Sequence, residues 1–182
     1  MLELAHKLAD CDSSFFGGWV MAGCRAFIDG AAAAFSVDTH LPRPRRAVVT
    51  VQGLDAGGRL RKSLTVHLLL PRERLAVKPD NVADEATGAL TAVHTFTKEE
   101  VEAYIAASGD ENIIHKGDTP IVPGLCMAAW LQGYLKLDRL DWDIRFLSIV
   151  RTGDELTVYH EVDMLTGWVG RRRAFVIKTN EF

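Results

Sequence analysis

The stretch from Ser108 to His115 concentrates side chains that can do acid–base chemistry. Its sequence, Ser-Gly-Asp-Glu-Asn-Ile-Ile-His, places the carboxylate of Asp110, the carboxamide of Asn112 and the imidazole of His115 within eight residues. Histidine exchanges protons readily near neutral pH, and a nearby aspartate can orient it, accept a proton or hold a water molecule. In an arbitrary sequence such residues more often have a structural role, with the acidic and amide side chains capping a turn and the histidine partly buried.

The order of these residues resembles the Ser-Gly-Asp-x-Asn-Pro-x-His motif of the MaoC-like (R)-specific enoyl-CoA hydratases, a family with the hot-dog fold. Every fixed position except the proline is matched. Flanking segments are also similar. Residues 98–107 are expected to form a short helix before the motif, residues 120–125 have the sequence Pro-Ile-Val-x-Gly-Leu at the start of a second helix, and residues 145–158 are expected to form a pair of strands. The resemblance covers roughly residues 89–180.

Two positions depart from the family pattern. Ile113 stands where the motif has proline, and Pro123 stands where a histidine often precedes the glycine that begins the helix. These departures keep open an alternative in which the protein binds acyl thioesters at a decayed site without catalysis.

The spacing from His115 to Gly124 is more similar to that of the β-hydroxyacyl-ACP dehydratases, which share the hot-dog fold. Those enzymes place an acidic residue inside the central helix, but residues 128–130 of this sequence are Ala-Ala-Trp. The resemblance therefore implies that Asp110 supplies the carboxylate of an active site.

The resemblance implies a reaction of an acyl thioester, whose α-proton is removable only if the charge on the carbonyl oxygen is stabilised. The N–H of Gly124, at a helix start, would do this through a hydrogen bond and the helix dipole. Asp110 and His115 would activate water for addition to the β-carbon, or act in reverse on a 3-hydroxyacyl thioester. No metal or redox cofactor is expected. The resemblance also implies polar residues that shape the loop and apolar residues that wall the acyl pocket, namely Ser108, Asn112, Met127, Trp130 and Leu131.

Other residues are weaker candidates. Cys126 lies close to the expected N–H donor, but a thiol on an apolar helix is usually an inert core residue. His67 and His94 fall in expected strands, where a structural role is favoured. A group of basic residues near the N-terminal strands fits a CoA phosphate, an acidic carrier protein or a solvated strand edge equally well, and comprises Arg43, Arg45, Arg46, Arg59, Arg61 and Lys62.

The second half of the chain contains the elements that would position this chemistry. Residues 89–96 have strand character, and Thr97 to Glu100 form a capping box that predicts a helix from Lys98 to about Gly109. The apolar segment 124–135 predicts a helix buried on most sides. Three closing strands are expected at 144–151, 155–164 and 172–179, with turns at 152–154 and 166–170.

The first half predicts a helix from Phe15 to roughly Phe35, because Ala31 to Ala34 have high helix propensity. A proline-containing basic loop is expected at 41–46. Two strands are expected at 47–52 and 61–70, with a hairpin loop at 55–58 between them, and a polar connector follows at 71–88.

Composition narrows the class of protein. The 182 residues are 48% hydrophobic and 25% charged, as in ordinary globular proteins. A net charge of −3 argues against nucleic-acid binding. Three widely spaced cysteines form no ligand cluster, and no signal peptide or convincing membrane span is visible. A cytoplasmic protein without a structural metal is expected.

These features predict an α+β hot-dog domain over residues 89–182, with an antiparallel sheet around the helix at 124–135. Residues 1–88 are expected to form a helix and strands that could be a reduced second hot-dog unit. The expected function is hydration of 2-enoyl thioesters, or the reverse dehydration, on CoA or acyl carrier protein, and thioester hydrolysis is the alternative activity. Hot-dog domains usually pair, so a homodimer or higher oligomer is expected unless the first half supplies the partner.

Overall fold

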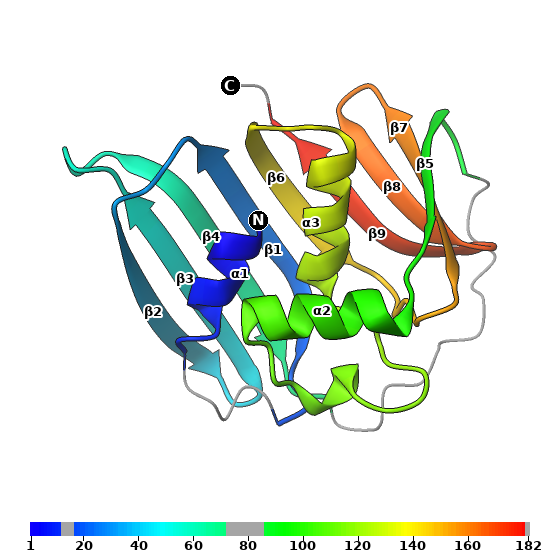
Figure 1. The fold of residues 1–182 in the computed structure, drawn as a ribbon, viewed down its shortest axis with the longest axis horizontal. Coiled ribbons are helices and arrows are strands. Elements are labelled where there is room, and N and C mark those ends of the chain that lie inside the picture. The colour runs from blue at the N-terminus through cyan, green and yellow to red at the C-terminus, as the bar shows by residue number, and fades with distance from the viewer. Residues whose placement is uncertain (12–16, 72–85, 181–182) are drawn as a thin grey trace.

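A nine-stranded antiparallel sheet, with helices packed on one face, runs through the computed structural model, which describes residues 1–11, 17–71 and 86–180 (Figure 1). The strand order is β2-β3-β4-β1-β6-β9-β8-β7-β5. The first half contributes α1 (Leu2–Leu8), β1 (Val20–Asp29), β2 (Ala34–Arg43), β3 (Arg46–Leu54) and β4 (Leu60–Leu69). The second half contributes β5 (Ala89–Thr95), α2 (Lys98–Ser108), the 3₁₀ turn η2 (Ile113–His115), α3 (Gly124–Tyr134), β6 (Arg139–Phe146), β7 (Glu155–Glu161), β8 (Met164–Val169) and β9 (Arg172–Thr179).

The helix predicted between Phe15 and Phe35 is wrong, because the described part of this segment forms β1 and β2. In β1, Cys24, Ala26 and Ile28 are buried, which is the two-residue period of a strand. Hydrogen bonding holds β1 between β4 and β6, while Ala31 to Ala33 lie in the connection to β2 and Ala34 begins β2, which pairs with β3. Residues 15 and 16 of that prediction, and residues 72–85 of the predicted connector, lie outside the described residues.

The other predicted elements of the first half are largely confirmed. Strand β3 contains the segment expected at 47–52, β4 matches the segment expected at 61–70 to within one residue at each end, and their hairpin loop includes residues 55–58. Much of the predicted loop at 41–46 belongs instead to the ends of β2 and β3, with a two-residue turn between Arg43 and Arg46.

In the second half, β5, α2 and α3 lie where the sequence predicts them. The C-terminal strands need correction, since four strands replace the three expected. Val162 and Asp163 form a turn that ends β7, and residues 166–169, predicted as a turn, belong to β8. Residues of β8 are buried between β7 and β9, which favours the strand. Strand β6 runs from Arg139 to Phe146, so the strand predicted at 144–151 begins five residues too late and ends five residues too late.

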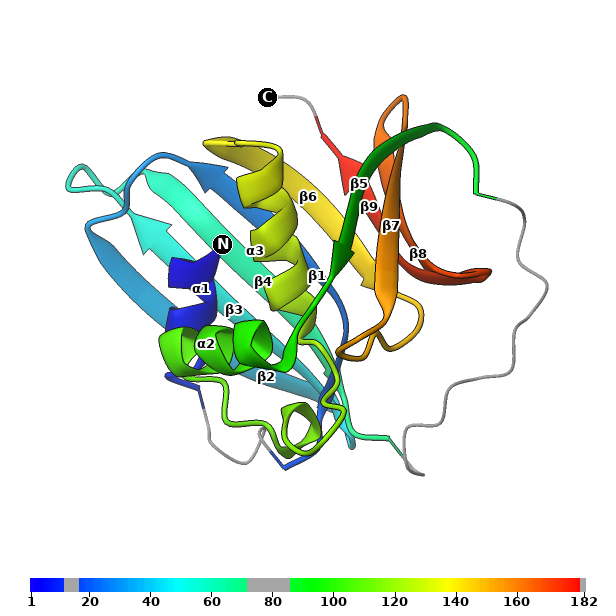
Figure 2. The same cartoon turned by 45° about the vertical axis from the view of Figure 1, so that its right-hand side comes forward.

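The two halves join where β1 pairs with β6, from Gly23 opposite Arg145 to Asp29 opposite Arg139. This pairing makes one continuous sheet from strands of both halves. On its helical face, α1 lies against β3 and β4, while α3 lies over β6 (Figures 1 and 2).

Helix α3 forms the centre of the core. Leu131 is fully buried, and the buried residues of this helix pack in one cluster with inward side chains of the strands, such as Trp142, Ile144 and Phe175. Burying a leucine side chain of this kind contributes about 1.5 to 3 kcal/mol to stability. The prediction of a helix buried on most sides is confirmed. Among the described residues, no helix has the length and apolar character needed to cross a membrane.

Candidate active site

The end of α2 places Asp110. The helix begins at the predicted capping box, in which the Glu100 N–H donates to the Thr97 hydroxyl and the Glu100 carboxylate accepts from the Thr97 N–H. It ends at Gly109, whose left-handed φ of 73° and N–H bond to the Ile105 carbonyl turn the chain out of the helix. Asp110 is therefore the first residue of the loop, and the turn at Gly109 sets the direction in which the chain leaves α2.

Asn112 holds that loop against the first half of the chain. Its amide nitrogen donates to the Trp19 carbonyl at 2.7 Å, and its side-chain oxygen accepts from the Ile114 N–H at 3.3 Å. The Asn112 backbone N–H donates in turn to Oδ1 of Asp110 at 3.1 Å. Both the nitrogen and the oxygen of the Asn112 carboxamide thus form hydrogen bonds within the protein, and Oδ1 of Asp110 is held by the Asn112 N–H.

His115 faces the other oxygen of Asp110. Its Nδ1 lies 2.7 Å from the Ile121 carbonyl, and because a carbonyl only accepts, Nδ1 must carry the hydrogen. Nε2 then lies 3.5 Å from Oδ2 of Asp110, with its lone pair available in the neutral ring. His115 is 8% exposed and Asp110 is 29% exposed at the side chain. The pair is therefore arranged to hold a water molecule and take a proton from it.

Burial lowers the pKa of His115 below its usual 6.5, while the charge of Asp110 and the bond to the Ile121 carbonyl act in the opposite direction. Burial is the largest of the three effects. The imidazole is consequently neutral at pH 7, which is the form that can accept a proton.

We expect NMR titration of His115 to give a pKa below 6.5, and a lower pKa still in Asp110→Asn. The substitution removes the negative charge that favours the protonated ring, while burial remains. A reaction that needs neutral His115 should then keep its rate until the pH falls through this lowered pKa. A His115 pKa that rises in Asp110→Asn would contradict the arrangement.

The N-terminus of α3 lies in the same region. Within the described part of the chain, the Gly124 N–H makes no hydrogen bond, while the Cys126 and Met127 N–H groups bond to the Pro123 carbonyl. A side chain at Gly124 would bring its Cβ to 2.6 Å from Cζ of Phe146. Glycine therefore permits close approach of the helix start to this ring and leaves an unused donor.

A cavity of about 420 Å³ connects these groups. Gly124 and Met127 line it together with the loop residues Ser108, Asp110, Asn112 and His115. Its lining is mostly apolar, as in small-molecule sites with a few placed polar groups. The candidate residues predicted from the sequence are therefore largely brought together.

Trp130 and Leu131, predicted as pocket walls, are not among the described residues that line this cavity. Leu131 is buried in the core, and Trp130 stacks on His94 with ring centroids 4.9 Å apart. Both lie beyond the first turn of α3, whereas the cavity reaches only the residues near its start, such as Met127.

Sequence reasoning missed the wall that the first half provides. It consists of apolar residues of α1, β1 and β4 and their direct neighbours, namely Ala5, Leu8, Ala9, Trp19, Val20, Met21, Ala22, Leu68 and Leu69. The family resemblance began at residue 89, so no motif pointed to this wall. The available signal was the alternation of apolar residues in the strand at 61–70. Such alternation indicates that one face of a strand is buried, but it does not identify the element or cavity that the face contacts.

Tyr104 is another cavity residue that the sequence did not indicate as functional. It lines the cavity, and burial, reinforced by Cys126 and Asp110, raises the pKa of its phenol well above 10 despite a hydrogen bond with Ser108. The phenol therefore stays neutral and can donate a hydrogen bond.

Burial likewise raises the pKa of the Cys126 thiol to about 12, so this thiol stays protonated. No group of three or more metal-ligating side chains occurs among the described residues.

An antiparallel sheet wrapped around the central helix α3 defines the hot-dog fold. Solved structures share it. HtdX from Mycobacterium tuberculosis has a TM-score of 0.70 and 18% sequence identity, covering 100% of this chain and 84% of that one. A MaoC-like dehydratase has a TM-score of 0.66 and 12% identity over 100% and 83% of the two chains. An acyl-ACP thioesterase from Bacteroides thetaiotaomicron has a TM-score of 0.57 and 12% identity over 88% and 75%.

No protein-family model matches the sequence, and no curated protein is similar to it in sequence. The predicted hot-dog fold is confirmed by the structural comparisons, which include MaoC-like dehydratases and thioesterases. At these sequence identities the likeness is one of fold.

Proposed function

We propose that the protein hydrates 2-enoyl thioesters, or dehydrates 3-hydroxyacyl thioesters in the reverse direction. One observation carries the proposal: Nε2 of neutral His115 and Oδ2 of Asp110, 3.5 Å apart, share an apolar cavity with the unused N–H of Gly124. Likeness of fold to MaoC-like dehydratases supports the same reaction class.

In the proposed reaction, Asp110 and His115 activate water, and the Gly124 N–H stabilises the charge on the thioester oxygen. Asp110 and His115 hold water, and Nε2 of His115 takes its proton as the oxygen adds to the β-carbon. Electron density moves to the thioester oxygen, where the Gly124 N–H and the positive end of α3 stabilise the enolate. The protonated histidine then returns the proton to the α-carbon. The net reaction adds one water molecule across the double bond, and dehydration follows the same steps in reverse.

Thioester hydrolysis is a second candidate, because an acyl-ACP thioesterase shares the fold. Here the water held by Asp110 would attack the carbonyl carbon and release the thiol. The same cavity and the same helix-start donor would serve both reactions, so the position of the attacked carbon decides between them.

Incubation with crotonyl-CoA distinguishes these functions. We expect loss of the enone absorbance while the thioester stays intact, which identifies a hydratase. Release of free thiol would identify a thioesterase. Neither change, at enzyme concentrations close to that of the substrate, would leave only binding of acyl thioesters and overturn the proposed catalysis.

The cytoplasmic location and the homodimer predicted from the sequence stay predictions. For assembly, the first half already supplies one wall of the cavity through α1, β1 and β4. We therefore propose that the active site is complete within one chain, whatever oligomer forms.

A further inference from the structure

One face of helix α1 lines the cavity. Ala5, Leu8 and Ala9 are all lining residues, and their spacing of three and four positions puts them on the same side of the helix. Ala9 follows the last residue of α1 but keeps a helical backbone, with φ −65° and ψ −17°. We term these three residues the α1 wall. It is apolar, and it comes from an element that carries none of the proposed acid–base groups.

Helix α1 has a fixed position on the sheet. Leu4 is fully buried in the core, and Glu3 forms an ion pair with Lys62 of β4. At the other end of the helix, a side chain at Gly109 would bring its Cβ to 3.2 Å from Cβ of Ala9. The end of α1 therefore packs directly against the turn that ends α2.

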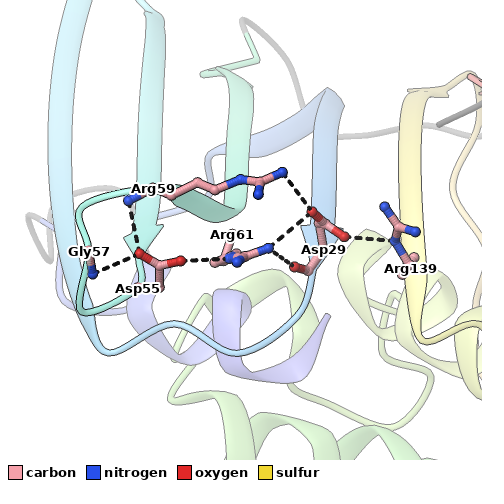
Figure 3. A network of polar contacts seen from close by, with 6 residues as sticks. All are labelled: Asp29, Asp55, Gly57, Arg59, Arg61 and Arg139. Carbon is pink, nitrogen blue, oxygen red and sulfur yellow. Dashed lines mark hydrogen bonds and ion pairs between the residues drawn. The ribbon is translucent and has the colours of Figure 1, made fainter.

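The strand that holds α1 is itself tied to its neighbours by charged side chains (Figure 3). Asp29 of β1 lies 3.4 Å from Arg61 of β4 and 2.7 Å from Arg139 of β6. Asp55 accepts from Arg61 at 2.8 Å. Lys62 follows Arg61 directly, so its ion pair joins α1 to a part of the sheet that is linked across three strands. The α1 wall is therefore well placed to be a firm boundary of the cavity.

The proposed reaction gives the direction in which an acyl chain runs. The carbonyl oxygen faces the Gly124 N–H and the β-carbon lies beside Asp110 and His115, so the carbons beyond the β-carbon continue past this pair. Helix α1 lies there, because Ala9 packs against Gly109, the residue before Asp110. The tail of the acyl chain thus points toward the α1 wall.

The size of the cavity limits the length of that tail. An apolar cavity of about 150 Å³ accommodates benzene, which has six carbon atoms. On the same scale, the cavity of about 420 Å³ holds about 17 non-hydrogen atoms. Several of these atoms belong to the thioester and the arm that carries it, which leaves room for an acyl chain of about eight to twelve carbons.

We propose that the α1 wall sets the length of the acyl chain, with Ala5 and Leu8 as the residues at which the tail ends. The inference rests on the proposed function, since the reaction places the carbonyl and the β-carbon. It names the substrates as thioesters of medium-chain acyl groups. Ala5 leaves room that a larger side chain would fill, whereas Leu8 fills room that a smaller side chain would leave. The two positions therefore allow changes in opposite directions.

The test is the affinity for saturated acyl-CoA thioesters of increasing chain length, measured by calorimetry. These compounds lack the double bond, so they cannot be hydrated. Each buried methylene raises the affinity by about three- to fourfold, so the Kd should fall with length and level off at about eight to twelve carbons.

The length at which the Kd levels off should move in the variants. In Ala5→Leu we expect it about two to three carbons earlier, because leucine fills space that the chain would occupy. In Leu8→Ala we expect it about two to three carbons later, for the opposite reason. Ala103→Leu is the matched control: Ala103 is exposed on α2 and does not line the cavity among the described residues, so the length dependence should stay as it is.

The same length dependence in Ala5→Leu, Leu8→Ala and the unsubstituted protein would overturn the proposal. So would an affinity of the unsubstituted protein that does not rise with chain length. If the thermal midpoint shows that Ala5→Leu does not fold, Leu8→Ala decides alone, since only a limit at longer chains supports the α1 wall.

The outcome is separate from that of the hydration assay. A length limit that moves with the α1 wall supports the inference even if crotonyl-CoA is not hydrated. Hydration of crotonyl-CoA with a length limit that does not move would instead leave the hydratase and remove α1 from the acyl site.

Discussion

Asp110→Asn and His115→Ala are each expected to lower kcat for the hydration of crotonyl-CoA by about 10²- to 10⁴-fold, the usual contribution of a general acid–base group. Asparagine preserves the shape of Asp110 and can still accept from the Asn112 N–H through Oδ1, so the loop should keep its form. It removes the charge that faces Nε2 of His115. Alanine at His115 removes the proton acceptor itself.

The measurement is kcat together with the thermal midpoint of each variant. His67→Ala serves as the control, since His67 is exposed on β4 and takes no part in the cavity lining among the described residues. Because Asp110 and His115 act on one water molecule, the double variant should lose little more than either single variant. Rates equal to those of the unsubstituted enzyme in both single variants would remove the pair from the proposed mechanism.

Gly124→Val is expected to lower kcat by about 10²- to 10³-fold, the loss typical of one misplaced oxyanion donor. The first carbon of the new side chain would lie 2.6 Å from the ring of Phe146, so either the ring or the helix start must move. Since Phe146 and Gly124 both line the cavity, this movement occurs where the thioester oxygen is proposed to bind. Crowding of this kind also costs about 1 to 3 kcal/mol of stability, a few degrees in Tm for a chain of this size.

Gly133→Val is the matched control in the same helix. A side chain at Gly133 would meet no atom within 4 Å, and the residue is exposed, so kcat should stay unchanged. Assaying kcat and the thermal midpoint on the same preparations separates catalysis from folding. If Gly124→Val lowers only the midpoint, Gly124 has a packing role and the donor must be sought elsewhere.

Local signals predicted the elements around the chemistry well. The capping box at Thr97, the glycine after Ser108 and the apolar run from Gly124 each act within a few residues, and α2 and α3 lie where they indicate. The loop from Ser108 to His115 was recognisable as a candidate site because the order of its residues resembles a family motif. Its Asp110–His115 proximity follows from a short turn that the sequence itself contains.

Features decided by distant contacts were not predictable in this way. Ala31 to Ala34 favour a helix locally, but they lead from β1 into β2, and β1 is fixed by pairing with β4 and β6, which lie far along the chain. The turn at Val162 and Asp163 lacks the glycine or proline that usually marks such a position. The cavity wall from α1, β1 and β4 depends on how two halves meet, and that information is not local to either half.

The pairing of β1 with β6 also governs what either half could do alone. Arg25 and Asp141, which bond across it, are 116 residues apart, so this junction forms only when distant parts of the chain have been drawn together. Without the first half, β6 would become an exposed edge strand with unpaired N–H and C=O groups, which is a template for aggregation. The half that carries Asp110, His115 and Gly124 thus depends on the other half to cover the edge of its sheet as well as for one wall of its cavity.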